Sequence, residues 1–498
     1  MQIKPDETGK IDYSVLKFST EISRNKKMIE EIFAGDKTVI FREFCNRENP
    51  DAKFLAVFVD GMVDSLAINQ GIIKPVTECT GMEKSPGLLE RIGAGVITGN
   101  EIELTQSTQD AVSKIMYGDT AVFAEGQAGA LTVNSKGFAT RGISEPDDEK
   151  NLKGPREGFN ESMMTNLGML RRKLQTSDFR VSMINFGSRT NTKACLCYMD
   201  GLVDKKILND LQNRLKTIET DGVLDVNQIG ECIKDSPYSP FKTIGESEKP
   251  DIVAAKLLEG RIALLLDGTP MTLTVPYLFI ENFQSADDYY INFYYGTIGR
   301  ILRILAFFVS TSVPALYLAF TAFNQEMIPP TLLISISAAE QGVPFPIFVE
   351  FLGMSIVFEI LRETGIRNPD KIGQAMSIVG ALVVGQAAVE AKIISAPTVI
   401  VVALAGVTGL MLPKLSGAII VVRFGMLLAS AMLGLYGYFF AVLASVICLL
   451  GTKSFGIEYT SQFLSLKPQN LKDIYIRAPM RFLKTRPLFI SPERNRRA

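Results

Sequence analysis

The sequence contains no histidine and no tryptophan among its 498 residues. The absence of histidine excludes Ser-His-Asp and Cys-His catalysis, zinc ligation through imidazole and an imidazole-based pH switch. Walker A, GxGxxG, kinase and GxSxG motifs are also missing from the sequence. We therefore expect a protein that is not an enzyme and that needs no cofactor and no metal.

The sequence also lacks a strong net charge, because 52 Lys and Arg stand against 53 Asp and Glu. This balance argues against a nucleic-acid partner. The charges are nevertheless segregated: residues 1–299 have a balance of −9, residues 300–450 of +1 and residues 451–498 of +7. The sequence thus predicts a soluble domain, an apolar domain and a basic tail, and the asymmetry indicates membrane lipid as a partner.

The apolar domain consists of long hydrophobic runs, each close to the roughly 20 residues that cross a bilayer as a helix. They are residues 301–323, 343–361, 372–389, 393–412 and 416–450. As one helix the last run would measure about 52 Å against a hydrocarbon core of about 30 Å. A division near Gly434–Gly437 gives an all-α bundle of six spans. Four spans with a re-entrant segment at 328–342 remain an alternative.

The topology follows from Lys and Arg, which favour the cytoplasmic side. Arg300 and Arg303 precede the first run, the 324–342 loop has no Lys or Arg, and the 362–371 loop is basic. Together with the basic tail, this distribution predicts a multi-pass protein with both termini in the cytoplasm.

The soluble domain contains an internal repeat. Residues 55–64 (LAVFVDGMVD) match 195–204 (CLCYMDGLVD), and residues 118–133 match 260–275, at offsets of 140 and 142. These matches predict two related units, at about 36–144 and 178–286. Each has a strand that ends in Asp-Gly, a helical stretch and a hairpin with an acid-Gly turn, which predicts an α/β or α+β unit with a mixed sheet.

Acidic residues follow the matched strands at Asp60, Asp64, Asp200 and Asp204. Their spacing permits a metal site or an acid–base pair, but an Asp after a strand is more often a turn or helix-cap residue, and we favour that reading. Nearby, Cys195 and Cys197 alternate along a strand and are expected to be free, buried thiols on one face.

A linker at 154–174 joins the two units, and its apolar residues recur at helical spacing from Phe159 to Leu174. This helix either packs across both units or contacts a neighbouring subunit. The candidate contact residues are Arg156, Phe159, Glu161, Asn166, Asp60 and Asp200.

Ionisable residues within the apolar runs are costly and point to function. They are Glu350, Glu359 and Arg423. Glu359 stands three residues before Arg362 and is placed to pair with it, while Glu350 and Arg423 are an alternative ion pair.

Prolines at 329, 330, 344 and 346 interrupt the helices just before Glu350. Interrupted helices are tolerated in membranes where they face protein or water. We hypothesise that residues 328–359 line or gate a cation pathway formed by several subunits. The candidate residues are Ser335, Ser337, Glu340, Pro344, Pro346, Glu350, Glu359 and Arg423.

Several motifs resemble the A subunit of GerA-type spore germination receptors. They are GPREGFNES (154–162), EGRIALLLDGTP (259–270), VPALYLAF (313–320), GVPFPIFVEFLGMSIVFEILRETGIRNP (342–369), IGQAMSIVGALVVGQAAVEA (372–391) and DIYIRAPMRFLKTRP (473–487). They span most of residues 150–487 in family order. Two departures are Ser355, where the family often has an acid, and Met480-Arg481, where it often has an aromatic residue after Ala-Pro.

The resemblance implies a subunit of a nutrient-gated complex in the inner membrane of dormant spores. It further implies a homo-oligomer that conducts monovalent cations, with a transporter-like B subunit and a C lipoprotein as partners. A sporulation-stage paralogue that works as an accessory channel is a second possibility within the same fold. A non-conducting structural or signalling scaffold of the receptor complex is a third.

Overall fold

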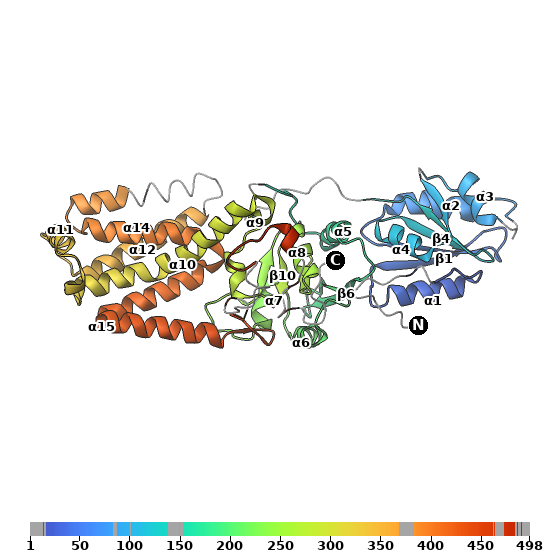
Figure 1. The fold of residues 1–498 in the computed structure, drawn as a ribbon. Coiled ribbons are helices and arrows are strands. Elements are labelled where there is room, and N and C mark those ends of the chain that lie inside the picture. The colour runs from blue at the N-terminus through green and yellow to red at the C-terminus, as the bar shows by residue number, and fades with distance from the viewer. Residues whose placement is uncertain are drawn as a thin grey trace.

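The computed structural model shows three parts in a row: a first sheet unit (unit 1), a second sheet unit (unit 2) and a helical bundle at the opposite end from unit 1 (Figure 1). The residues it describes are 13, 16–82, 87–99, 101–137, 149, 153–367, 380, 383–461, 463, 473–483, 486 and 490. The expected span at 372–389 is therefore only partly covered, and residues 383–390 of it are helical.

Unit 1 is a five-stranded sheet covered by helices on both faces. Its elements are α1 (Ile22–Ile32), β1 (Val39–Cys45), β2 (Lys53–Val59), the π-helix η1 (Ala67–Ile73), α2 (Lys74–Glu78), α3 (Leu88–Gly95), β3 (Ile102–Thr105), α4 (Thr108–Met116), β4 (Thr120–Ala124) and β5 (Ala130–Val133). The strand order is β1-β2-β4-β5-β3. Strand β2 is buried from Phe54 to Val59, because both of its faces lie under helices.

Unit 2 repeats this arrangement. Its elements are β6 (Phe179–Phe186), β7 (Thr192–Met199), α6 (Lys205–Lys216), α7 (Val226–Ile233), β8 (Gly245–Ser247), α8 (Pro250–Leu258), β9 (Ile262–Leu266) and β10 (Thr272–Val275). The order β6-β7-β9-β10-β8 is that of unit 1, strand for strand. The same topology in both units is what a duplicated sequence would produce.

Every strand pair in the two sheets is antiparallel, so the mixed sheet predicted from the sequence is wrong. The β4–β5 hairpin of unit 1 inserts between β2 and β3, so that each strand runs against both of its neighbours. Unit 2 inserts its β9–β10 hairpin in the same way. Because no pair is parallel, the units are α+β in architecture.

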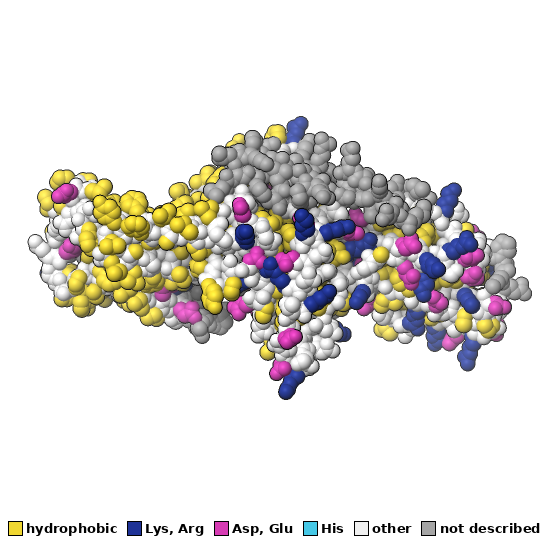
Figure 2. All heavy atoms as spheres, turned by 90° about the horizontal axis from the view of Figure 1, so that it is seen from below, with side chains coloured by type: hydrophobic (Ala, Val, Ile, Leu, Met, Phe, Trp, Pro, Cys, Tyr) yellow, Lys and Arg dark blue, Asp and Glu magenta, His cyan; other side chains and the backbone are white. Residues whose placement is uncertain are grey.

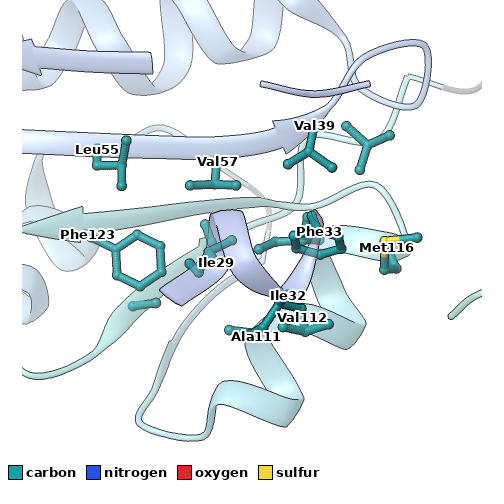
Figure 3. Packing of buried hydrophobic residues seen from close by; sticks show 14 of the residues in the cluster. Ile29, Ile32, Phe33, Val39, Leu55, Val57, Ala111, Val112, Met116 and Phe123 are labelled. Carbon is teal, nitrogen blue, oxygen red and sulfur yellow. The ribbon is translucent and has the colours of Figure 1, made fainter. Parts of the chain in front are cut away.

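Each sheet has a hydrophobic core on both faces. In unit 1, α1 and α4 cover one face and pack residues such as Ile29, Val112 and Phe123 together (Figure 3). The segment from η1 to α3 covers the other face. In unit 2, α6 and α7 cover one face, and α8 with the linker helix α5 (Met163–Lys173) covers the other.

Helix α5 occupies the last part of the predicted 154–174 linker. It begins at Met163 because the Ser162 side chain accepts a hydrogen bond from the Thr165 amide, 3.5 Å away, and so caps the helix. It ends in three basic residues, which suit the negative end of the helix dipole. Residues 154–160 precede the helix and form no regular secondary structure.

The last part of the chain is predominantly helical. Its elements are η2 (Phe279–Phe283), α9 (Asp287–Tyr290), α10 (Phe293–Ala322), η3 (Gln325–Met327), α11 (Pro330–Glu340), α12 (Ile347–Arg367), α14 (Ala396–Leu410), η4 (Pro413–Leu415), α15 (Ser416–Gly451), β11 (Lys453–Ser454), β12 (Ile457–Glu458) and η5 (Met480–Phe482). Among the described residues, α10 and the segment 413–451 are long and apolar enough to cross a membrane. Apolar side chains gather over this bundle, whereas charged ones gather over the sheet units (Figure 2).

Helix α15 is divided at Gly434, whose φ of 60° and ψ of −136° are non-helical. Only glycine adopts such a conformation readily. The two arms of α15 therefore meet at an angle at the far end of the bundle (Figure 1). The helix is therefore divided within the Gly434–Gly437 region that the sequence predicted from the excessive length of the last apolar run.

Candidate functional site

The polar residues of the bundle form separate clusters at different depths, which we call layers. The far layer, around Glu350, lies at the end of the bundle far from the sheet units. Glu350 is only 3% exposed, and its Oε2 accepts a hydrogen bond of 2.7 Å from the backbone amide of Ser395. Ser395 is the N-cap residue of α14, and its hydroxyl lies 2.9 Å from that of Thr398. Helix N-termini carry unpaired amides and a positive partial charge, so this carboxylate is held as a capping group between two helices.

Two further polar groups approach Glu350 in this far layer. Glu340 of α11 and Tyr317 of α10 both interact electrostatically with Glu350. Glu340 Oε1 and the Tyr317 hydroxyl are buried without a hydrogen-bond partner within the described part of the chain. Unpaired buried polar atoms are costly, so the far layer is a place where a bound cation or water would gain interactions.

The second polar layer is an ion triad of Arg423, Glu359 and Arg362. Arg423 Nη2 pairs with Glu359 Oε1, and Arg362 Nη2 lies 2.9 Å from Glu359 Oε2. Glu359 therefore pairs with Arg362, as its spacing predicted. The alternative ion pair between Glu350 and Arg423 is wrong, because Glu350 is engaged by the N-terminus of α14 and Arg423 by Glu359.

The remaining candidates of the 328–359 segment do not converge with these layers within one chain. Ser335, Ser337, Pro344 and Pro346 are exposed. Ser335 donates a hydrogen bond of 3.0 Å to the Thr331 carbonyl of its own helix. Helix α11 buries only Ile336. Of the pathway candidates in this segment, the structure thus brings Glu340 and Glu350 together and leaves the Ser and Pro residues at the surface.

A third cluster of charges lies where the bundle meets unit 2, and the sequence did not predict it. Arg300 Nε lies 3.4 Å from Asp288 Oδ2, and Arg300 Nη1 lies 3.2 Å from Asp473 Oδ1. Arg303 also pairs with Asp288. The Tyr289 hydroxyl lies 3.0 Å from both carboxylate oxygens of Asp473.

This junction cluster ties the distant tail to two consecutive segments, α9 and the first turns of α10. Burial raises the pKa of Asp473 and outweighs the opposing effect of Arg300. From the sequence, Arg300 and Arg303 indicated only membrane topology. Asp473 stands 173 positions from Arg300, so no local pattern connects them.

Unit 1 meets the linker helix through a fully buried ion pair. Arg171 pairs with Asp36, and neither side chain is exposed. The Thr38 hydroxyl accepts a second hydrogen bond of 2.6 Å from the same guanidinium. At the same interface Gly168 faces the Gly61 carbonyl so closely that an added Cβ would lie 2.9 Å from that oxygen. Helix α5 therefore packs against both units.

The predicted contact residues of the linker fall into two groups. Phe159 is buried in the core of unit 2 and donates from its amide to the Glu248 carbonyl at 2.7 Å. The Glu161 carbonyl accepts from the Gly268 amide at 2.8 Å. Asn166 is buried but bonds to Asn160 within the linker, and Arg156 is exposed. Phe159 and Glu161 thus contact unit 2, whereas Asn166 shapes the linker itself.

The acidic residues after the strands act as turn and cap residues, as favoured from the sequence. Asp60 Oδ1 accepts from the Gly61 amide at 3.0 Å, and Asp204 caps α6. Asp200 is exposed and lies 3.8 Å from Arg180. Within the described residues, no group of three or more His, Cys, Asp or Glu could hold a metal ion.

The two cysteines of strand β7 lie on one face, as predicted. Their sulfur atoms are 3.8 Å apart, and both thiols are free and buried. Burial raises the pKa of the Cys197 thiol, so the reactive thiolate form is disfavoured.

A duplicated sheet domain joined to membrane-length helices defines an α+β protein with an apolar helical module. The family model described as Bacillus/Clostridium GerA spore germination protein matches residues 27–489. The chain therefore belongs to the GerA spore germination family, which confirms the resemblance of its motifs to the A-type receptor subunits.

The relatives span nearly the whole chain. Spore germination protein KA of Bacillus subtilis (strain 168) is 37% identical over 477 residues, 95% of this chain and 88% of that protein. The uncharacterized membrane protein YfkQ of the same organism is 36% identical over 475 residues, 94% of this chain and 91% of that protein. A crystal structure of the N-terminal domain of the A subunit of the Bacillus megaterium germinant receptor GerK3 is 28% identical. It has a TM-score of 0.43 and covers 53% of this chain and 98% of that one.

Proposed function

We propose that this chain is the membrane subunit of a spore germinant receptor, and that several copies form a nutrient-gated pathway for monovalent cations. The observation that carries the proposal is the far polar layer, where two carboxylates and a phenol from three different helices lie close enough to interact electrostatically, each with buried polar atoms. Oxygen atoms of this kind replace the hydration shell of a cation. Intramembrane carboxylates are costly and therefore point to function.

The proposed topology has six spans with both termini in the cytoplasm. Contacts at the two ends of the bundle support the number of spans, and the distribution of Lys and Arg supports the orientation. At the far end, Gly342 lies against Lys392 and Gly434 against Phe323. At the near end, the Lys414 ammonium lies 3.8 Å from Glu149 of the segment between the sheet units. Protease added to right-side-out vesicles should spare residues 1–299, and cleavage there from outside would overturn the orientation.

The conduction test uses the purified full-length chain in liposomes loaded with a cation-sensitive dye. We expect an oligomer that conducts, and we expect Glu350→Gln to reduce the flux because it removes the charge of the far layer. Glu326→Gln is the matched control, because Glu326 is exposed at the same end of the bundle. Equal flux from both variants at equal protein levels would contradict the role of Glu350.

The second candidate is a non-conducting scaffold. It is favoured by the pairing of Arg423 with Glu359 and of Glu350 with the α14 N-terminus, because both are satisfied within a single chain. On this reading the charges stabilise the bundle, which only anchors the protein, and the cytoplasmic sheet units relay the signal or assemble the receptor complex. A strict monomer without flux would favour the scaffold over the channel.

A further inference from the structure

Helix α10 is longer than the bilayer that it would cross. Its 30 residues span about 45 Å, whereas the hydrocarbon core is about 30 Å thick. About ten residues therefore extend into the headgroup layer. They lie at the N-terminal end of the helix, since that end follows unit 2 in the chain and is bound to α9 through Asp288.

The arginines of this protruding stretch point inward, away from lipid. Arg300 is fully buried and pairs with Asp288 and Asp473, and Arg303 also pairs with Asp288. The exposed side chains are instead aromatic: Tyr294 is 66% and Tyr295 is 60% exposed. Tyrosine is enriched at membrane–water interfaces because its ring is apolar and its hydroxyl is polar.

The basic tail lies against the same stretch. The Arg477 amide donates to the Thr297 hydroxyl at 3.2 Å, and Arg300 Nη1 bonds to the Ile474 carbonyl at 3.2 Å. Just beyond, η5 exposes Met480 and Phe482 by 63% and 57%. Large apolar side chains on a basic segment beside a membrane helix are typical of an interfacial anchor.

We propose that this surface binds the anionic phospholipid headgroups of the leaflet that faces unit 2. We call it the interfacial face, and it consists of Tyr294, Tyr295, Ile476, Met480, Arg481 and Phe482. The basic balance of +7 over residues 451–498 complements an anionic surface. The inference rests on the membrane insertion proposed above and is independent of ion conduction.

The absence of tryptophan from the sequence gives a direct test. Phe482→Trp places a single fluorophore on the interfacial face of the full-length chain in lipid nanodiscs. We expect a blue-shifted emission that is quenched by phospholipids brominated near the headgroup. Leu66→Trp, on exposed Leu66 of unit 1, is the control that should stay hydrated and unquenched.

A third variant shows whether the bundle is inserted in the membrane at all, so that a wrong interfacial face can be told apart from a lack of insertion. Leu443 is more than half exposed within the second arm of α15, so Leu443→Trp reports the bilayer interior. Quenching of Leu443→Trp by deeply brominated lipids, without quenching of Phe482→Trp or of Met480→Trp, would overturn the interfacial face alone. A hydrated Leu443→Trp would overturn insertion itself.

The charge of the face is tested by Arg481→Glu and Arg481→Lys, each combined with Phe482→Trp. A basic side chain near an anionic surface contributes about 1 kcal/mol, or about fivefold in affinity. We expect quenching of the parent Trp variant to increase when the nanodiscs contain phosphatidylglycerol. Arg481→Glu should reduce this increase at least about fivefold, and Arg481→Lys should preserve it. Equal quenching in zwitterionic and anionic nanodiscs would show that headgroup charge is not recognised.

Discussion

The two sheet units share one strand order but differ in what they hold. Unit 2 continues after β10 into an aromatic cluster, in which the ring centroid of Phe279 lies 6.0 Å from that of Phe307 on α10 and 5.7 Å from that of Tyr459. Unit 1 is joined to the rest through the buried Arg171–Asp36 pair and the close approach of Gly168 to Gly61. Unit 2 is thus continuous with the segment that packs against α10, whereas unit 1 is attached to the linker helix through a charged contact.

The largest effect is expected from breaking the attachment of unit 1. Arg171→Ala leaves the Asp36 carboxylate buried without its partner, which should lower stability by about 3–5 kcal/mol. Thermal unfolding of the full-length chain in detergent, with hydrogen exchange of unit 1, measures this loss. Arg172→Ala is the control: its pair with Glu157 is partly exposed, so about 0–1 kcal/mol is expected. Equal losses would mean that the buried pair does not hold unit 1.

The second prediction concerns the junction cluster between α9, α10 and the tail, which Asp473→Ala should loosen. This change removes hydrogen bonds to Arg300 and Tyr289, and bonds to charged groups contribute about 1.5–3 kcal/mol. We expect faster hydrogen exchange at residues 473–477 and at the first turns of α10, with unit 1 unchanged. Glu458→Ala, at an exposed acid of the same C-terminal region, should have no such effect. Faster exchange throughout unit 1 would contradict the separate roles of the two units.

Adding a methyl group to one helical glycine in each region should change stability by a smaller amount, and in opposite directions. Gly168→Ala forces α5 away from the Gly61 carbonyl and should cost about 1–3 kcal/mol, as overpacking does. Gly230→Ala in α7 meets only the Leu273 side chain, at 3.5 Å or more, and should be neutral or stabilising by up to about 1 kcal/mol. The same unfolding measurement applies, and a stabilising Gly168→Ala would contradict the close packing of α5 on unit 1.

The smallest expected effect is an opposite response of the two units to acid. Glu281 of η2 pairs with Lys256 and Arg261 of unit 2. Burial acts to raise the pKa of Glu281, but Arg261 and Lys256 outweigh it, so the pKa lies below its usual 4.5. Its contribution to stability is present above pH 4.5 and is lost as the pH falls through the lowered value. In unit 1, burial raises the pKa of Asp119 above its usual 3.8, so its contribution is present below that value and is lost as the pH rises.

Glu281→Gln and Asp119→Asn test this sign difference. Thermal unfolding of each variant is compared with the parent chain between pH 3 and 6, roughly one to two units around the ordinary carboxyl pKa values. As the pH falls, Glu281→Gln should lose less stability than the parent chain, and Asp119→Asn should lose more. Parallel pH profiles for both variants would contradict the assignment.

Much of the local structure was predictable from the sequence. The Asp-Gly pairs at 60–61 and 200–201 mark equivalent turns, and both glycines adopt positive φ, at 81° and 79°. The repeat offset predicted two units, and their shared strand order agrees with it. The sheet type was not predictable, because the insertion of a hairpin between two earlier strands leaves no mark on the periodicity of any strand.

The candidate site was predicted only in part. Glu350, Glu359 and Arg423 were found because charge within an apolar run is visible in the sequence. Their partners were not all found, since Glu350 bonds to a backbone amide that any residue would supply. The exposure of Ser335 and Ser337 was missed for a related reason: helix α11 packs loosely, and both serines lie on its exposed side, whereas Glu340 at its end is partly buried.

The sequence by itself determined the segregation of charge, the apolar runs, the repeated turns and the division of the last helix at Gly434. These follow from the preferences of single residues and their near neighbours. Tertiary structure decided which charges meet: Arg171 with Asp36, Arg423 with Glu359 and Arg300 with Asp473, at separations of 135, 64 and 173 positions. Burial requires that a charge be paired, but only the packing of distant segments selects its partner.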